Sequence, residues 1–372
     1  MEIRLRSVVS EISSAYADLG TFLPLMLGTV LVAGMNPVGI LYGFGLFALM
    51  TALVYRLPIP VQPMKAVAAM AIAGMATPEV LMATGLLLGG VLLVLSTTDV
   101  TNSLKCLIPN TVLHGMRVAL AISLVSTTIG LADFGSSPLW LLLAGLIILQ
   151  ITALRIVSCL LVLVFGWWFL VPELPIGFVV ERWYWPAFSW PSSDALVLSI
   201  KASFFPQLAL TITNAMILTA VIAKEYFPEN EKALTERRLA FTSGIANLLL
   251  APMGAMPMCH GAGGLVAHHT LGSRTGWSIA VFGITCILLA GLLGEQVIAL
   301  LQTVPNAVLG ALVLYAAWIL CDPITLFRAK LPCQLVIISM VPVALVYDLM
   351  AALVFGLAAE VLRARLMRVL SS

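Results

Sequence analysis

The chain has 372 residues, of which 61% are hydrophobic and 10% are charged, and its mean hydropathy is +1.08. A soluble domain carries about 25% charged residues, so water is not the main solvent of this chain. The net charge of +2 says little about partners, and we expect none of them to be a nucleic acid. The composition predicts an all-α polytopic membrane protein.

Apolar runs close to the roughly 20 residues that span a bilayer recur along the whole chain. The first half contains seven predicted segments, at 13–33, 38–55, 61–76, 79–97, 105–130, 138–154 and 156–171. A Trp-rich connection at 171–195 follows, and its composition is typical of the membrane–water interface. The second half contains seven more, at 196–223, 239–251, 256–272, 275–293, 296–320, 332–347 and 349–366.

Seven segments per half is an odd number, so the two halves enter the membrane from opposite sides. This is the arrangement of two inverted repeats, with about 14 transmembrane segments in total. One stretch supports the internal similarity: QPMKAVAAMA from Gln62 aligns with MPMCHGAGGL from Met256, and each opens the third segment of its half.

The distribution of basic residues agrees with this topology when the N-terminus is placed in the cytoplasm. Fifteen Lys and Arg residues then lie inside, Arg182 and Lys201 lie outside, and Lys65 and Arg117 lie within spans, which accounts for all 19. This satisfies the positive-inside rule. We therefore expect an integral protein of a bacterial inner membrane with cytoplasmic N- and C-termini.

The third and tenth segments begin with proline-rich sequence. Pro58, Pro60 and Pro63 precede the third, and Pro252 and Pro257 precede the tenth. Proline is tolerated at the first helical position but not in the interior. The pattern predicts extended lead-ins and half-helices that start at about Pro63 and Pro257, at a depth where irregular backbone must line a cavity or be covered by protein.

Two helix N-termini that meet inside a membrane protein form an anion site, because each presents free N–H groups and a partial positive charge. We expect this site to include the following residues around the two breaks: Gln62, Pro63, Met64, Lys65, Met258, Cys259, His260 and Gly261. The structural alternative is that the prolines only kink the helices and the glycines only permit packing. The matching positions in both halves favour a binding site.

Further polar residues occur within predicted spans. Asp18, with Thr21 nearby, lies in the first segment, and an intramembrane carboxylate is a candidate for function. Asp18 pairs with Lys65, relays a proton or caps local backbone, and His260 is a second candidate proton carrier. In the eighth segment, Gln207 and Asn214 are seven residues apart and are expected to share a helix face, from which their amides donate to an oxyanion or hold helices together.

Other chemistries lack the residues they need. The nearest candidate metal ligands, around His260 and His268, are about 12 Å apart along a helix, and no carboxylate accompanies them. GAGGL lacks the strand and spacing of a nucleotide-binding loop, and no nucleophile–base pair is evident. We expect no metal, no cofactor and no enzymatic activity.

Four stretches resemble the molybdate transporters related to the sulfate permease superfamily: ADLGTFLPL (17–25), PVQPMKAVAA (60–69), PQLALTITNA (206–215) and GAMPMCHGAGGL (254–265). The resemblance covers essentially the whole chain. It implies the uracil-permease-like fold in one transmembrane domain, 1–372, with a core part (13–97 and 196–293) that binds substrate. A gate part (105–171 and 296–366) completes that fold, and the sulfate permeases' regulatory domain after the last span is not expected. Ala209 and Ala215 depart from the family pattern beside Asn214.

The function that this resemblance implies is molybdate import by a secondary transporter with elevator-like movement. Since no nucleotide motif is present, a gradient must drive import of a dianion, and protons are the expected coupling ion. Sulfate, tungstate or another anion is the main alternative substrate, and a neutral nucleobase is a second. Membrane lipid is an expected partner, and a homodimer is compatible with the sequence.

Overall fold

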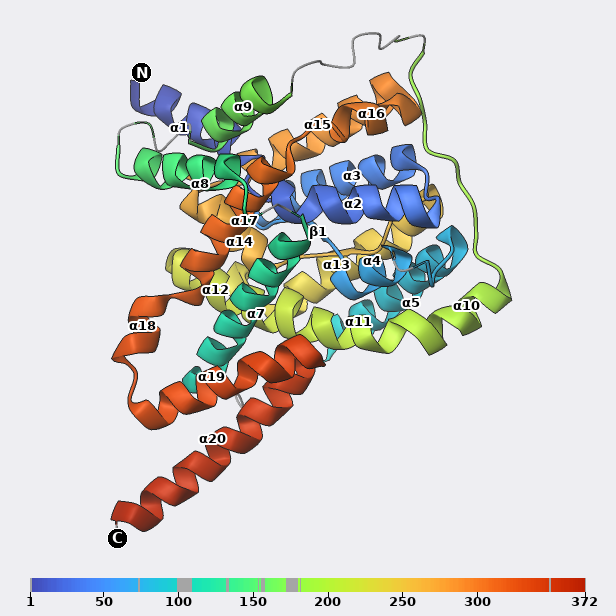
Figure 1. Cartoon of the computed structure of the whole chain (residues 1–372). Coiled ribbons are helices and arrows are strands. Elements are labelled where there is room, and N and C mark those ends of the chain that lie inside the picture. Colours follow the sequence, from blue (N-terminus) through green and yellow to red (C-terminus); the bar gives the residue numbers. More distant parts are fainter. Residues whose placement is uncertain are drawn as a thin grey trace.

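The computed structural model describes residues 2–72, 74–98, 109–131, 134–152, 154, 158–171, 180, 182–347 and 349–371. These residues are mostly helical (Figure 1). Five helices among them are long and apolar enough to cross a membrane: Val8–Ala33, Pro37–Tyr55, Pro78–Thr97, Gln207–Tyr226 and Trp277–Leu301. The expectation of a mostly helical protein with several apolar membrane helices is confirmed.

The first half of the chain follows the predicted order of segments. Its elements are α1 (Glu2–Ser14), α2 (Leu19–Ala33), α3 (Pro37–Tyr55), β1 (Gln62–Pro63), α4 (Lys65–Ile72), α5 (Pro78–Thr97), α7 (Asn110–Leu131), α8 (Ser137–Gln150) and α9 (Ser158–Leu170). α3 and α5 each begin with a proline that follows a capping residue, Asn36 and Thr77 respectively. The side chain of each capping residue accepts a hydrogen bond from a backbone N–H in the first turn, which fixes the start of the helix. Residues 105–108 of the segment expected at 105–130 lie outside the described residues.

The second half begins with a long helix that changes type along its length. It runs through α10 (Ser193–Ser199), η2 (Ile200–Phe204), α11 (Phe205–Leu210), η3 (Thr211–Leu218) and α12 (Thr219–Tyr226), of which η2 and η3 are π-helical. The remaining elements are η4 (Pro228–Ala233), α13 (Glu236–Leu250), η5 (Ala251–Met253), β2 (Met258–Cys259), α14 (Ala262–Thr270), α15 (Trp277–Leu293), η6 (Gly294–Gln296), α16 (Val297–Leu301), α17 (Asn306–Cys321), α18 (Pro323–Arg328), α19 (Leu331–Val346) and α20 (Leu349–Ser371).

Two predicted segments are divided in the structure. The first is interrupted between Ser14 and Leu19, so that Asp18 occupies a turn directly before α2. The one expected at 296–320 is also divided, because α16 extends α15 and a turn ending at Pro305 precedes α17. Pro305 cannot supply the N–H that a continuous helix needs at that point.

The two half-helices start later than the prolines indicated. α4 starts at Lys65, two residues after Pro63, and α14 starts at Ala262, five residues after Pro257. The intervening residues form β1 and β2, which pair antiparallel with Gln62 opposite Cys259 and Pro63 opposite Met258. Strand pairing satisfies backbone groups that a buried lead-in would otherwise leave without partners.

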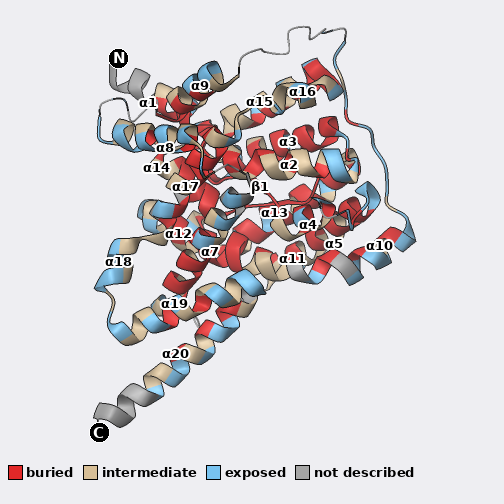
Figure 2. Ribbon diagram, viewed as in Figure 1, coloured by how far each residue is buried: buried red, intermediate tan, exposed pale blue. Residues whose placement is uncertain are grey.

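The helices pack in two groups around this strand pair (Figures 1 and 2). One group contains α2, α3, α4, α5, α13 and α15, with α3 against α15 and α5 against α13, while α14 packs against α12 and α17. The other contains α7, α8, α17, α19 and α20. α17 connects the groups, because it packs against α2 and α14 as well as α7. Figure 2 shows that the residues around the strand pair are mainly buried.

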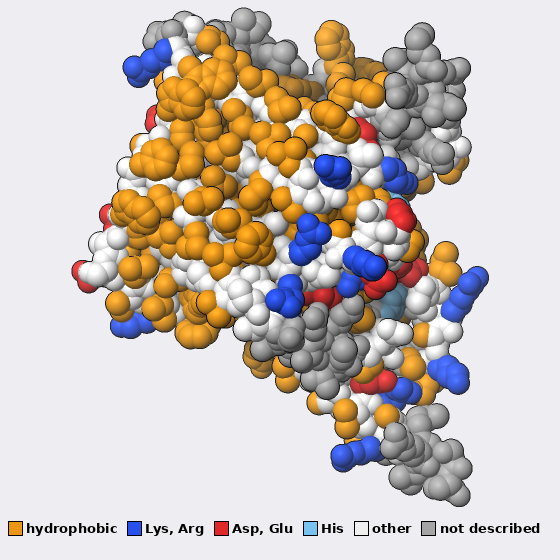
Figure 3. Space-filling model, turned by 180° about the vertical axis from the view of Figure 1, so that it is seen from behind, with side chains coloured by type: hydrophobic (Ala, Val, Ile, Leu, Met, Phe, Trp, Pro, Cys, Tyr) orange, Lys and Arg blue, Asp and Glu red, His pale blue; other side chains and the backbone are white. Residues whose placement is uncertain are grey.

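The outer surface is apolar over a broad face (Figure 3). Large hydrophobic side chains on the helices of the first group are exposed, including Leu53, Val94, Leu249 and Trp277. Such an area far exceeds the apolar patches of soluble monomers, and the chain is an integral membrane protein. Lys and Arg side chains gather along one side of this face (Figure 3).

Candidate functional site

The candidate site lies at the junction of the two interrupted helices. Besides the strand pairing, the backbone N–H of Met64 donates to the carbonyl of Pro257 at 2.9 Å. Gln62, Met64 and Met258 are almost completely buried. Each strand leads directly into its half-helix, so the N-termini of α4 and α14 both lie beside the strand pair, as predicted for a shared anion site.

Asp18 and Gln62 form a hydrogen-bonded pair against α14. The Gln62 Nε2 group donates to Asp18 Oδ2 at 2.5 Å, and Thr21 also hydrogen-bonds to the Asp18 side chain. Gly264 makes this contact sterically feasible, because a Cβ there would lie 2.5 Å from Asp18 Oδ2 and 2.7 Å from Gln62 Nε2. A Cβ on Gly261 would collide with the Gln62 amide in the same way. The structure thus brings together three predicted site residues and Thr21.

Lys65 is the first residue of α4, and its Nζ is buried. Among the described residues this ammonium has no hydrogen-bond partner. Asp18 and Cys259 are close enough to interact with it electrostatically, yet no ion pair with Asp18 within 4 Å is present in the described part of the chain, so the direct pairing considered from sequence is not formed. A buried charged donor without an acceptor is costly, and such groups call for an explanation.

Gln207 contacts the N-terminus of α4 from the long helix of the second half. Its Oε1 accepts from the backbone N–H of Ala66 at 2.9 Å and of Val67 at 3.4 Å, while its Nε2 donates to Thr211 Oγ1 at 3.0 Å. This places Gln207 in the predicted site, but with the carbonyl oxygen rather than the amide N–H groups directed at the half-helix. An acceptor at a helix N-terminus shows that these N–H groups attract negative partial charge.

The second interrupted helix is held by neutral hydrogen bonds. Asn247 on α13 mimics a neighbouring strand: its Oδ1 accepts from the Met258 N–H at 2.9 Å and its Nδ2 donates to the Met258 carbonyl at 2.6 Å. His260 is fully buried, with Nδ1 2.9 Å from the Pro60 carbonyl oxygen and Nε2 2.8 Å from Thr242 Oγ1. Since a carbonyl only accepts, Nδ1 carries the ring proton. Both ring nitrogens therefore have partners.

Asn214 is buried in the π-helical segment η3, and its Oδ1 has no hydrogen-bond partner among the described residues. The prediction that Asn214 shares a face with Gln207 assumed an α-helix, whereas π turns carry more residues per turn. The role of Asn214 at the site stays a prediction.

Beside Asp18 lies a small cavity that His268 and Val61 also line. Its volume is about 10 Å³, which is room for about one water molecule. A tetrahedral oxyanion is several times larger. Loading such a ligand next to Asp18 therefore requires surrounding groups to move apart.

Sequence analysis missed several residues that shape this region. Asn247 hydrogen-bonds to β2 and Thr242 hydrogen-bonds to His260. Each could have been found from the sequence as a polar side chain in an otherwise apolar span. Arg117 on α7, which was placed within a span but given no partner, forms an ion pair with Glu225 on α12. No local pattern indicates that pair, because its members are far apart in the sequence.

Two solved structures share this fold. The transmembrane domain of a cyanobacterium bicarbonate transporter, BicA, matches with a TM-score of 0.62 at 18% identity, over 95% of this chain and 98% of that chain. SLC26A9 matches with a TM-score of 0.61 at 12% identity, over 97% of this chain and 65% of that one. The chain therefore has the fold of these two proteins.

Sequence comparison then gives the family. The model of the family described as "Molybdate transporter of MFS superfamily" matches residues 10–124 and 200–320, and the chain belongs to this family. Relatives include Molybdate transporter 1 of Arabidopsis thaliana, 28% identical over 84% of this chain and 78% of its own length, and Molybdate transporter 2 of the same plant, 27% identical with the same coverages. Molybdate transporter 1 of Chlamydomonas reinhardtii is 25% identical over 82% and 81%. The resemblance identified from the four motifs is confirmed.

Proposed function

We propose that this protein imports molybdate and that the anion binds between the N-termini of α4 and α14. The observation that carries the proposal is the Lys65 Nζ, a buried cation without a hydrogen-bond partner among the described residues, at the start of α4. Family membership and relatives named as molybdate transporters support the choice of anion. A dianion would supply the missing acceptor, and the half-helix N–H groups would contribute further positive potential.

The proposed binding residues are those expected from the sequence around the two breaks, together with Gln207 and Asn214. Gln62, Lys65 and Gln207 have the strongest support. Gln62 contacts the Asp18 carboxylate, Gln207 contacts the start of α4, and the buried Lys65 ammonium has no hydrogen-bond partner among the described residues. Pro63, Met64, Met258, Cys259 and Gly261 would shape the site through the strand pair and its close approach to α14.

The architecture we propose is two inverted repeats of seven segments, with the core part at 13–97 and 196–293 and the gate part at 105–171 and 296–366. The two packing groups described above support this division, except that α16 continues α15 and so belongs with the core.

We further propose elevator-like movement of the core. The narrow space beside Asp18 supports a moving mechanism, since it is too small for an oxyanion.

Transport is proposed to be coupled to protons through Asp18. Its carboxylate contacts Gln62 on β1 and lies against Gly264 on α14, so that a change in its charge would act on both halves of the site. His260 is the weaker candidate carrier, because both ring nitrogens are already engaged by Pro60 and Thr242.

We place the protein in a bacterial inner membrane with cytoplasmic termini. The start of α1 and the end of α20 lie on the same side of the molecule (Figure 1).

The test is uptake of molybdate by the purified protein in proteoliposomes. We expect saturable uptake that excess tungstate or sulfate reduces and excess uracil does not. Competition by uracil would favour a nucleobase permease, and linear flux without saturation would indicate a channel. Either result would refute the proposed transport function.

Proton coupling is tested separately in the same vesicles. Collapsing the pH gradient should abolish accumulation in the wild type, and Asp18→Asn should lose gradient-driven accumulation while retaining exchange of molybdate across the membrane. His260→Gln is the comparison variant and should remain responsive to the gradient. If accumulation is unaffected by collapsing the gradient, proton coupling is wrong.

A further inference from the structure

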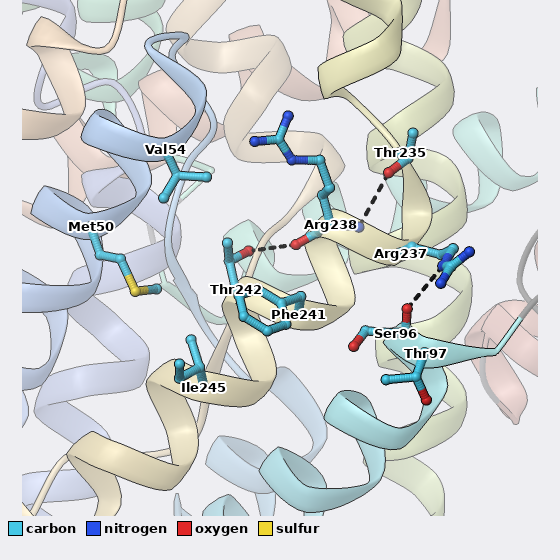
Figure 4. A pocket seen from close by; sticks show the side chains of 10 residues that line it. All are labelled: Met50, Val54, Ser96, Thr97, Thr235, Arg237, Arg238, Phe241, Thr242 and Ile245. Atoms are coloured by element: carbon cyan, nitrogen blue, oxygen red, sulfur yellow. Dashed lines mark hydrogen bonds between the residues drawn. The ribbon is translucent and has the colours of Figure 1, made fainter.

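A pocket of about 880 Å³ lies away from the proposed transport site, between the ends of three helices of the first packing group. Met50 and Val54 line it from the end of α3, and Ser96 and Thr97 from the end of α5. The start of α13 completes it with Thr235, Arg237, Arg238, Phe241, Thr242 and Ile245. Figure 4 shows these side chains around the hollow.

The pocket has two chemically different halves. Arg237 and Arg238 lie at the end where the helices terminate, with the hydroxyl groups of Ser96, Thr97 and Thr235 nearby. Met50, Val54, Phe241 and Ile245 form the other half, one or more turns further along the helices. Val54 and Phe241 are 38% and 49% exposed, so this half opens onto the outer apolar surface rather than toward the protein interior.

The two arginines are held in place at this end. Arg237 Nε donates to the Ser96 carbonyl at 2.9 Å, which joins α13 to α5. The Arg238 guanidinium lies over the Tyr55 ring, with Cζ 5.8 Å from the ring centroid, and the residue is exposed. Positions at the ends of membrane-crossing helices lie at the depth of lipid headgroups.

We propose that this pocket binds an anionic phospholipid. The phosphate would lie against Arg237 and Arg238 and the hydroxyl groups, while an acyl chain follows Met50, Val54, Phe241 and Ile245 into the membrane. Arginine is suited to this role, because its planar guanidinium recognises phosphate oxygens by paired hydrogen bonds. The combination of basic and apolar halves matches a lipid better than a free anion, which would leave the apolar half unused.

A lipid in this pocket would also contact the support of the transport site. Thr242 lines the pocket and hydrogen-bonds to His260, which in turn donates to the carbonyl of Pro60 just before β1. Bound lipid would therefore stabilise the packing of α3, α5 and α13 around β2. The lipid site itself does not depend on which anion is transported.

Native mass spectrometry of the delipidated protein tests this proposal with phosphatidylglycerol and phosphatidylcholine as probes. We expect tighter retention of phosphatidylglycerol, and a loss of about 25-fold in its affinity in the Arg237→Gln/Arg238→Gln variant, since each basic residue near an anionic lipid contributes about fivefold. Arg328→Gln, at an exposed position on α18, is the charge-matched control and should retain the lipid like the wild type.

Three further measurements test the lipid site if the double variant does not fold. Arg238→Gln alone should lose about fivefold, and Ile245→Trp should reduce retention by filling the apolar half while keeping both arginines. Phosphatidylglycerol should also raise the unfolding temperature of the wild type, whereas millimolar inorganic phosphate should not. Equal retention of both lipids, equal stabilisation by phosphate, or undiminished binding by Arg238→Gln and Ile245→Trp would each overturn the proposal.

Discussion

Lys65 opens the first turn of α4, whereas Ala262, Gly263 and Gly264 form the first turn of α14. Both half-helices follow a two-residue strand, and the strands pair with each other. The first half-helix carries the full positive charge of Lys65, and the backbone N–H of Ala66 in its first turn donates to Gln207 Oε1. The second brings small residues against which Asp18 and Gln62 pack closely.

This difference indicates that the two interrupted helices contribute different properties to the proposed site. A site for a dianion needs positive potential, but it also needs backbone that can approach the ligand without steric hindrance. Lys65 and the N–H groups of α4 supply the positive potential, and the glycines of α14 permit the close approach of backbone to ligand. The four predictions below separate these contributions.

The largest effect is expected from removing the charge of the first half-helix. Lys65→Met should weaken molybdate binding about hundredfold, because hydrogen bonds to charged groups contribute about 1.5–3 kcal/mol and the ammonium also adds long-range attraction. Isothermal titration calorimetry on the purified protein measures this change. Lys201→Met, at an exposed lysine, is the matched control and should bind within twofold of the wild type. Unchanged affinity in Lys65→Met would leave only the helix N-termini as the anion site.

The second prediction reverses the sign of the potential at the same helix. Gln207→Glu keeps an acceptor for the N–H groups of Ala66 and Val67 but adds a negative charge there. We expect about a twentyfold loss of molybdate affinity, since this charge opposes a dianion by about 2 kcal/mol at an intermediate dielectric constant. Gln302→Glu, at an exposed glutamine, should have no effect. An unchanged affinity in Gln207→Glu would place the anion away from the start of α4.

The position of the two breaks was predictable because proline has a local effect on helix geometry. Pro63 and Pro257 each lie in a proline-rich stretch that disfavours a helix interior, and aligning these stretches gave the two segments that meet in the structure. The predicted first residues of α4 and α14 were less accurate. A strand of two residues has no periodicity to detect, so α14 begins five residues later than its proline indicated.

The side-chain partners of the site could not be predicted in the same way. The contact of Gln62 with Asp18 and that of Gln207 with α4 join residues 44 and 141 positions apart, and nothing in either local sequence specifies the other. The π-helical turns around Asn214 were not predicted either, because the sequence pattern used for these spans does not distinguish π from α turns.

The third prediction concerns the small residues of the second half-helix. Gly264→Ala would put a methyl group 2.5 Å from Asp18 Oδ2, which must separate Asp18 from Gln62 or displace α14. Overpacking of this kind costs about 1–3 kcal/mol, and we expect about a tenfold loss in the rate of molybdate uptake at low concentration. Gly90→Ala, where nothing lies within 4 Å of the added Cβ, is the control for the substitution itself. Normal uptake in both variants would show that the close approach at Gly264 is not needed for transport.

The smallest effect on binding is expected at Asn247, which supports the second half-helix without facing the proposed ligand. Asn247→Leu removes both hydrogen bonds to the buried backbone of Met258, and leaving these groups unsatisfied should lower the free energy of unfolding by about 2 kcal/mol. Molybdate affinity should fall only about threefold, because β2 remains paired with β1 and the charge of Lys65 is untouched. Thermal unfolding in detergent and calorimetry measure the two quantities on the same preparation, with Asn230→Leu in the loop before α13 as the control. If Asn247→Leu abolished binding while stability stayed normal, Asn247 would act on the ligand directly and the second half-helix would be more than a scaffold.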